Sequence, residues 1–455
     1  MKLYQEILAL SWPVITEKVL RTFMRTTDII VAGFLSPSAV AAVGLANLYS
    51  RLTLSVGIGL GGGAIALTSQ DTGSGATGNR DQTITQALLI GVLAGIPFAL
   101  FGFFLSRQAI SILGASFDLA QMGGAYLFIV MLSSPARLVS LIGARSFQGI
   151  GDTKTPMYIN VVANALNILG TIVLAFGLGP FPQLGVVGIA IATLVGDVFS
   201  AGALLLAIQS PKTPINFARP RDTRITRQLI RVSTPRTVEG FAELAGEFPL
   251  NAILLVFGTE VNAAYQIGRR VYQQLTSPFS RGFDVAASVQ VGQSLGNGDP
   301  NAAYSRGLAT SGLGFITVSG LSAIMFSGAD SLAFLFTRDM VTIPYATNFI
   351  RSFAVAAPLA ALFTILSGAL RGASDTRASL IGRTTSNFFF LLGISYFFGL
   401  RLEFGVSAVY LAIVLDYAWS TIVVGLAFYN RNWIEKVLVM MEERGGLSKI
   451  SKNPS

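Results

Sequence analysis

Long apolar stretches separated by short polar segments occupy most of this sequence. Of its 455 residues, 52% are hydrophobic and only 12% are charged, whereas soluble domains carry about 25% charged residues. A helix needs about 20 apolar residues to cross a bilayer, so the stretches predict an all-α polytopic membrane protein with twelve transmembrane helices. The spans are expected near residues 10–34, 40–68, 84–106, 121–146, 156–177, 185–208, 233–257, 262–292, 304–327, 345–370, 378–399 and 405–429.

The sequence contains no Cys and no His. Their absence excludes disulfides, thiolate or imidazole metal ligands and the Ser-His-Asp triad. We therefore expect neither an enzyme nor a cofactor. The net charge of +9 is interpreted by its distribution across the bilayer and not as a sign of nucleic-acid binding.

The basic residues of the loops predict the orientation. If the N-terminus is cytoplasmic, most loop Lys and Arg residues are cytoplasmic too, and only Arg107, Arg338 and Arg401 lie in loops on the opposite side. This asymmetry favours cytoplasmic positions for both termini.

An internal repeat divides the chain. The Ser-Trp-Pro segment with its glutamate at residues 11–17 recurs as Ser-Thr-Pro with a glutamate at 233–239, and the loop at 149–154 recurs at 372–377. An even number of spans in each copy predicts two six-helix lobes related by a pseudo-two-fold axis along the membrane normal. The expected domains are an N-lobe (1–208), a cytoplasmic linker (209–232), a C-lobe (233–430) and a cytoplasmic tail (431–455).

Charged residues inside the spans need a polar environment, because each is costly in lipid. At helical spacing Arg21 and Arg25 share one face of the first span with Glu17 and Asp28. The seventh span carries an acidic series instead. These charged residues are interpreted in one of two ways. They either line a substrate cleft or inter-lobe gate, or they form structural ion pairs within helices. The candidate residues are Arg21, Arg25, Arg51, Glu243, Glu247 and Arg270.

One face of the fifth span carries three amides, Asn160, Asn164 and Asn167. Amides at this spacing either form hydrogen bonds between helices or act as oxygen ligands beside a cation or a proton-bearing carboxylate.

Several motifs in order resemble the multidrug and toxic compound extrusion (MATE) family, closer to its DinF-like than to its NorM-like branch. They are Asp-Ile-Ile-Val-Ala-Gly at 28–33, the Gln148–Pro156 loop, its copy at 370–377, and Ala-Ala-Tyr-Gln-Ile at 263–267. The resemblance implies a plasma-membrane antiporter that exports organic compounds in exchange for H⁺ or Na⁺ by alternating access. The implied partners are the lipid bilayer and a small organic substrate, with no nucleic acid, and the protein is expected to be monomeric.

The resemblance also implies roles for particular residues. Asp28 matches the family's first-span coupling carboxylate, the site of Na⁺ if a metal ion binds at all, and Pro13 matches a helix-bending proline. The amides Asn164 and Asn167 are implied to face Thr193 and Asp197. Thr171 stands where many relatives carry an acid, so Asp197 is expected to be the second carboxylate. In the C-lobe Glu243 resembles a NorM-type ligand, but Ala360 stands at the position of the tenth-span acid and Arg270 at that of the span-8 amide, so the resemblance does not imply a NorM-type cation site there.

A second function stays open. Flippases of the same superfamily move lipid-linked anionic precursors and also place arginines in spans 1, 2 and 8. Twelve rather than fourteen spans favour the antiporter. Because arginine binds carboxylate or phosphate and stays charged when buried, we expect zwitterionic or anionic substrates. Neither the substrate nor the choice between H⁺ and Na⁺ follows from the sequence.

Overall fold

The computed structural model describes residues 2–445, and each regular element among them is helical. In lipid only a helix or a closed barrel satisfies every backbone hydrogen bond, so apolar runs of this length fold as helices. In chain order these are α1 (Lys2–Leu35), α2 (Pro37–Gly73), α3 (Thr77–Ile112), α4 (Phe117–Leu132), α5 (Ser134–Gly149), α6 (Lys154–Phe176), α7 (Val186–Gln209), α8 (Thr223–Phe257), α9 (Thr259–Leu275), α10 (Ser277–Gly296), α11 (Pro300–Ser327), α12 (Ala329–Phe336), α13 (Thr342–Gly372), α14 (Arg377–Thr385), the π-helix η1 (Ser386–Arg401), α15 (Val406–Tyr429) and α16 (Asn432–Glu443).

The predicted spans fall on these helices, either one by one or on two consecutive helices. Among the described residues, eight helices are long and apolar enough to cross a membrane, and nine spans result if the bent pair α4 and α5 counts as one. α1 is not one of the eight, because charged residues interrupt its apolar sequence. The number of twelve crossings therefore stays a prediction. Residues 446–455 of the predicted tail lie outside the described part of the chain.

Large apolar side chains are exposed along the long helices. Phe103, Leu206, Ile316 and Phe389 each expose more than 60% of their surface. Apolar surface of this extent is not stable in water and marks contact with lipid.

The described chain forms two compact units. Unit 1 comprises Met1–Ile15, Ser69–Gly75 and Val238–Ser455, and unit 2 comprises Thr16–Thr68 and Ala76–Thr237. This division differs from the predicted lobes, because unit 1 also contains the first turns of α1 and the last turns of α2, and unit 2 also contains the predicted linker and the first part of α8.

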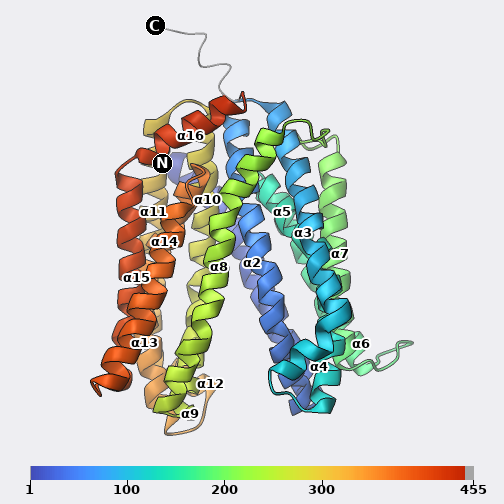
Figure 1. The fold of residues 1–455 in the computed structure, drawn as a ribbon, viewed down its shortest axis with the longest axis vertical. Helices are drawn as coiled ribbons and strands as arrows, with labels where there is room; N and C mark the ends of the chain where they lie inside the picture. Colours follow the sequence, from blue (N-terminus) through green and yellow to red (C-terminus); the bar gives the residue numbers. More distant parts are fainter. Residues whose placement is uncertain (1, 446–455) are drawn as a thin grey trace. The chain divides into compact units, whose positions relative to one another are not determined.

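In unit 2, α3 packs against α4 and α5, and α6 packs along α7 (Figure 1). The predicted fourth span is two helices, with a bend of 46° between α4 and α5. Pro135 in the first turn of α5 has no N–H for a hydrogen bond back into α4. The bend leaves Ser133 at the junction, where its side chain reaches α7.

In unit 1, α13 is the central helix and packs against α9, α10, α11 and α15. Small residues allow this approach, since alanines of α13 such as Ala357, Ala360 and Ala361 are fully buried in its core. The residue expected to correspond to a C-lobe acid, Ala360, is therefore part of the packing. Phe283 and Phe428 complete the same core.

Two glycines make equivalent close contacts in the two units. A Cβ on Gly59 of α2 would lie 2.9 Å from the Ser233 carbonyl oxygen of α8, and a Cβ on Gly282 of α10 would lie 2.9 Å from the Ser11 carbonyl oxygen of α1. Each helix start is thus held against a glycine in its own unit. Gly59 and Gly282 are as far apart in the sequence as the two copies of the repeated motifs, so the two contacts are equivalent in the repeat.

The segment after α16 is bonded to the end of α2 inside unit 1. The Arg444 Nε atom donates to Asp71 Oδ1 at 2.8 Å, and neither side chain is exposed. Arg444 Nη2 donates to Gln70 Oε1 at 2.8 Å, while Gln70 Nε2 donates to the Gly372 carbonyl oxygen at 2.7 Å. The last turn of α2, the end of α13 and the chain after α16 therefore form one buried polar cluster.

Candidate functional site

The Asp28 carboxylate of α1 lies buried in unit 2, with 7% of the residue exposed. Its hydrogen bond comes from the Thr171 hydroxyl of α6, which donates to Oδ1 at 3.0 Å. Among the described residues no Lys or Arg forms an ion pair with Asp28. A buried carboxylate that accepts a hydrogen bond from a hydroxyl and forms no ion pair can be compensated by a proton or a small cation.

The predicted amides continue the same face of α6, because Asn164, Asn167 and Thr171 follow at helical spacing. Asn167 Nδ2 donates to the Thr193 hydroxyl of α7 at 3.2 Å. Within the described chain, Asn167 Oδ1 and Asn164 Nδ2 are buried without a hydrogen-bond partner. Buried polar atoms are rarely left so, and the Asn167 oxygen can accept a hydrogen bond or bind a cation.

The side chains of Asp28, Thr171 and Asn167 provide oxygen atoms as ligands for a cation such as Na⁺. A carboxylate, a hydroxyl and an amide oxygen suit a hard cation. Within the part of the chain that the structure describes, no group of three or more His, Cys, Asp or Glu residues forms a metal centre. The coupling role of Asp28, Asn164, Asn167 and Thr193 stays a prediction.

Asp197 of α7 has a different set of partners from the one expected. Its Oδ2 accepts from Ser133 Oγ at 2.8 Å and from Arg137 Nε at 2.9 Å. The Asp197 carboxylate is thus compensated by an arginine of α5. This ion pair was not foreseen, because the sequence does not show which side chains meet between α5 and α7. In contrast, Asn160 Oδ1 accepts a hydrogen bond from the Ser200 hydroxyl, and this bond links α6 to α7.

The basic residues of α1 differ in their partners. Glu17 is 4% exposed and forms ion pairs with Lys18 at 3.1 Å and with Arg21 at 3.7 Å. Arg25 forms no hydrogen bond or ion pair with any described residue. The i, i+4 pair expected between Glu17 and Arg21 is thus present, whereas Arg25 and Asp28 do not pair.

In unit 1 the two predicted acids of α8 each have an arginine partner. Arg383 of α14 donates to Glu243 Oε1 at 2.8 Å and to Asp416 Oδ2 of α15 at 2.6 Å. Arg269 of α9 forms an ion pair with Glu247. Arg383 was not among the predicted functional residues, although a charged residue within the apolar span predicted at 378–399 was the signal that could have found it.

The remaining predicted residues are described by their exposure and their position in the helices. Arg270 is exposed and forms no ion pair with a described residue. Pro13 lies inside α1, in the part of that helix that belongs to unit 1. Pairing between the α1 arginines and the α8 acids, the proposed gate, stays a prediction.

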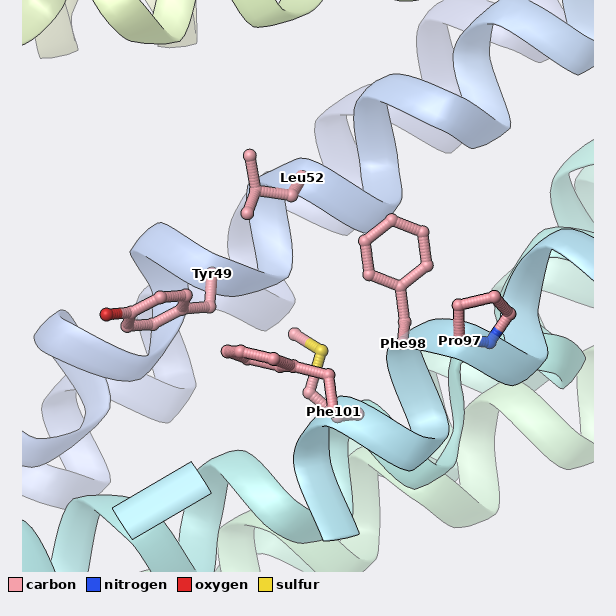
Figure 2. Close-up of a pocket in the computed structure, with 6 residues that line it drawn as sticks. Tyr49, Leu52, Pro97, Phe98 and Phe101 are labelled. Carbon is pink, nitrogen blue, oxygen red and sulfur yellow. The ribbon is translucent and has the colours of Figure 1, made fainter. Parts of the chain in front are cut away.

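A separate apolar pocket of about 200 Å³ lies between α2, α3 and the end of α4 (Figure 2). The only hydroxyl in its lining belongs to Tyr49, which donates to the Ala109 carbonyl oxygen at 2.7 Å. The pocket contains none of the predicted site residues. Its lining is Tyr49, Leu52, Pro97, Phe98, Phe101 and Met131.

Long lipid-facing helices with buried charged groups along them define a polytopic membrane protein. The MatE family model matches the chain in two segments, residues 13–173 and 235–399. The chain belongs to this family of transporters, which are multi-pass proteins of the plasma membrane.

Curated relatives resemble the chain over most of its length. The uncharacterized transporter YisQ of Bacillus subtilis is 24% identical over 439 residues, which cover 94% of this chain and 95% of the relative. The multidrug resistance protein NorM of Vibrio cholerae is 26% identical over 447 residues, covering 94% and 95%.

Solved structures share the fold. An outward-facing MATE family transporter of the MOP superfamily superposes with a TM-score of 0.88 at 21% identity, covering 95% of this chain and 96% of that chain. A MOP superfamily transporter from Pyrococcus furiosus, described as having a binding pocket of reverse polarity, superposes with a TM-score of 0.85 at 18% identity, covering 96% of both chains.

Proposed function

We propose that this protein is a secondary antiporter that exports organic compounds, drugs or metabolites, in exchange for H⁺ or Na⁺ by alternating access. The observation that carries the proposal is the buried Asp28 carboxylate, which accepts a hydrogen bond from Thr171 and has no cationic side chain paired with it. A curated relative named for multidrug resistance supports the class of exported compound.

In this proposal the coupling ion neutralises Asp28. An ionised carboxylate in a low-dielectric site is unfavourable unless a cation or a proton compensates it. Thr171 orients the carboxylate, and Asn167 supplies an amide oxygen that has no other partner among the described residues. Unit 2 then has two charge states, with and without the ion, and a rocking transporter uses such a difference to favour one of two conformations.

The proposed architecture is twelve spans in two six-helix lobes related by a pseudo-two-fold axis along the membrane normal. The two segments matched by the family model and the equivalent glycine contacts at Gly59 and Gly282 support it. We further propose a monomer with cytoplasmic termini. Buried Ala360 and exposed Arg270, at two positions expected to be C-lobe ligands, favour the DinF-like over the NorM-like branch.

The test is transport in proteoliposomes with Na⁺ and pH gradients imposed separately. Cationic, zwitterionic and anionic fluorescent dyes serve as substrates. Asp28→Asn should abolish gradient-driven transport while the variant still inserts and purifies as the wild type does. Asp118→Asn, which changes an exposed acid at the start of α4 in the same unit, should transport normally. Wild-type rates from Asp28→Asn would refute the proposal.

A further inference from the structure

The segment between α7 and α8, predicted as a linker, is fixed to α3 within unit 2 (Figure 1). Thr85 Oγ1 of α3 accepts a hydrogen bond from the Ala218 N–H at 3.0 Å. Gln82 Oε1 accepts from the N–H groups of Arg221 and Asp222, at 3.1 and 3.2 Å. Side chains of α3 therefore hold the backbone of this segment in a defined position.

The start of α8 is bonded to the same part of α3. Gln86 Nε2 donates to the Asp222 carbonyl oxygen at 3.1 Å, and Gln86 Oε1 accepts from the Thr226 hydroxyl at 2.7 Å. Arg227 follows directly in the sequence. Arg231 lies one turn further along α8, so these two arginines are neighbours on the helix surface.

Four arginines of this segment are exposed, and we call them the linker arginines: Arg219, Arg221, Arg227 and Arg231. The acids nearby have other partners. Asp222 pairs with Arg224 and Asp81 with Arg80, in both cases at 3.0 Å. Within residues 2–445 no acid forms an ion pair with a linker arginine. The hydrogen bonds to α3 thus place several uncompensated positive charges on one small surface of unit 2.

Lipid-facing side chains begin within one turn of this surface on three helices. Leu206, three residues before the end of α7, exposes 70% of its surface. Leu89 of α3, three residues after Gln86, exposes 47%, and Ile230 of α8 exposes 49%. All three helices are long and apolar enough to cross a membrane. The linker arginines therefore lie at the boundary between hydrocarbon and water, at the level of the lipid headgroups.

Anionic phospholipids are the anions that a membrane presents at this level. Basic residues next to a membrane-spanning helix attract them, and each Lys or Arg near the surface strengthens the interaction about fivefold. The planar donors of arginine also match the oxygens of a phosphate group. A nucleic acid or an acidic protein would need a surface that stands clear of the lipid, whereas these arginines begin within one turn of lipid-facing side chains.

We propose that the linker arginines bind the phosphate groups of anionic phospholipids and hold this segment at the membrane surface. The proposal does not depend on the proposed export function or on the coupling ion. Because α3 already fixes the backbone, lipid binding has to order only the arginine side chains, which lowers its entropic cost.

The experiment uses a fluorophore beside the linker arginines in the full-length protein. The chain has no cysteine, so Asn216→Cys, at an exposed residue of the same segment, provides a single labelling site. The labelled protein is placed in mixed micelles of a neutral detergent with phosphatidylglycerol or phosphatidylcholine, each carrying the same nitroxide quencher on its acyl chain. Phosphatidylglycerol should quench at about tenfold lower concentration. Added salt should reduce this difference, because screening weakens the attraction.

Variants of the labelled protein identify the residues responsible. Replacing Arg221, Arg227 and Arg231 together by Gln should bring the two lipids to within about twofold of each other. Replacing the same three by Lys keeps the charge and should keep most of the difference. The matched control removes as many charges from exposed arginines elsewhere in the chain and should behave as the wild type does. It combines Arg107→Gln, Arg338→Gln and Arg401→Gln.

Soluble competitors test other partners. Relief of the quenching by inorganic phosphate, by a polyglutamate peptide or by a short oligonucleotide, at constant ionic strength, would assign the surface to a soluble anion and overturn the proposal. Equal quenching by the two lipids, an unchanged difference in the glutamine variant, or an equal loss in the control variant would also overturn it. The salt dependence and the lysine variant keep the test decisive even if the glutamine variant does not fold.

Discussion

Unit 2 and unit 1 both bury carboxylates within long helices, but they surround them differently. In unit 2, Asp28 accepts a hydrogen bond from a neutral hydroxyl. In unit 1, Glu243 and Asp416 share the guanidinium of Arg383, and Asp416 is 1% exposed. Among the described residues, Asp28 is thus a buried acid with no ion-pair partner, whereas Asp416 and Glu243 share one arginine.

In the proposed function, this difference separates an exchangeable site at Asp28 from a structural one at Asp416. A carboxylate bound by arginine has its counter-charge supplied by the fold, and removing that partner strands a buried charge. A carboxylate whose hydrogen-bond donor is a hydroxyl has no counter-charge from that donor, and in the proposed function an ion from solution supplies it. The contrast arises within a repeated scaffold, since Arg383 and Asp416 occupy the repeat positions of Asn160 and Thr193 in unit 2.

The largest expected effect is on the stability of unit 1. Arg383→Gln should lower the free energy of unfolding by about 3–5 kcal/mol, because Asp416 and Glu243 lose their common partner. Asp28→Asn, which removes no ion pair, should change it by less than about 1 kcal/mol. Thermal unfolding followed by tryptophan fluorescence in detergent measures both. Replacing Arg383 and Asp416 together by Met and Leu should recover most of the loss, and equal losses in Arg383→Gln and Asp28→Asn would erase the contrast.

A smaller effect is expected at the hydroxyl beside Asp28. Thr171→Val removes the donor of a hydrogen bond to a charged group, worth about 1.5–3 kcal/mol, and the gradient-driven transport rate should fall about tenfold. Thr171→Ser keeps the hydroxyl and should retain most of the rate. Dye transport in proteoliposomes compares the two variants. Full activity in Thr171→Val would show that the hydroxyl beside Asp28 does not matter for coupling.

The smallest effect concerns an ion pair outside the spans. Hydrogen bonds from Arg224 hold the pKa of Asp222 below its usual range, so the pair stabilises the fold above the unfolded pKa of about 3.9 and loses this effect as the pH falls through the folded value. Arg224→Gln should cost less than about 1 kcal/mol at pH 7, because the arginine is exposed. The difference in melting temperature should shrink further on acidification below pH 4; a cost like that of Arg383→Gln would contradict this ranking.

The sequence predicted the positions of the long helices well, because the length and apolarity of a span follow directly from the bilayer. The span expected at 156–177 is α6, Lys154–Phe176. The break between α4 and α5 was not predicted, although Ser133, Ser134 and Pro135 mark it in the sequence. Periodicity gives the extent of a helix but not a bend imposed by packing.

The site was predictable only in part for a similar physical reason. A charged or strongly polar residue in an apolar span stands out in the sequence, so Asp28 and the α6 amides were predicted as site residues. Its partner does not stand out, because a hydroxyl such as Thr171 is common in helices. The pairing of Asp197 with Arg137 and of Asp416 with Arg383 depends on contacts between helices, which a helical wheel does not contain.

The buried bond between Arg444 and Asp71 also sets a condition on biosynthesis. Its two residues are separated by 373 positions, and a ribosome adding roughly 5–20 residues per second needs roughly 20 to 75 seconds to travel between them. Throughout that time Asp71 has been made and its arginine has not. The buried bond at the end of α2 therefore cannot form until nearly the whole chain has been synthesised, so the final packing of this helix end is one of the last steps of folding.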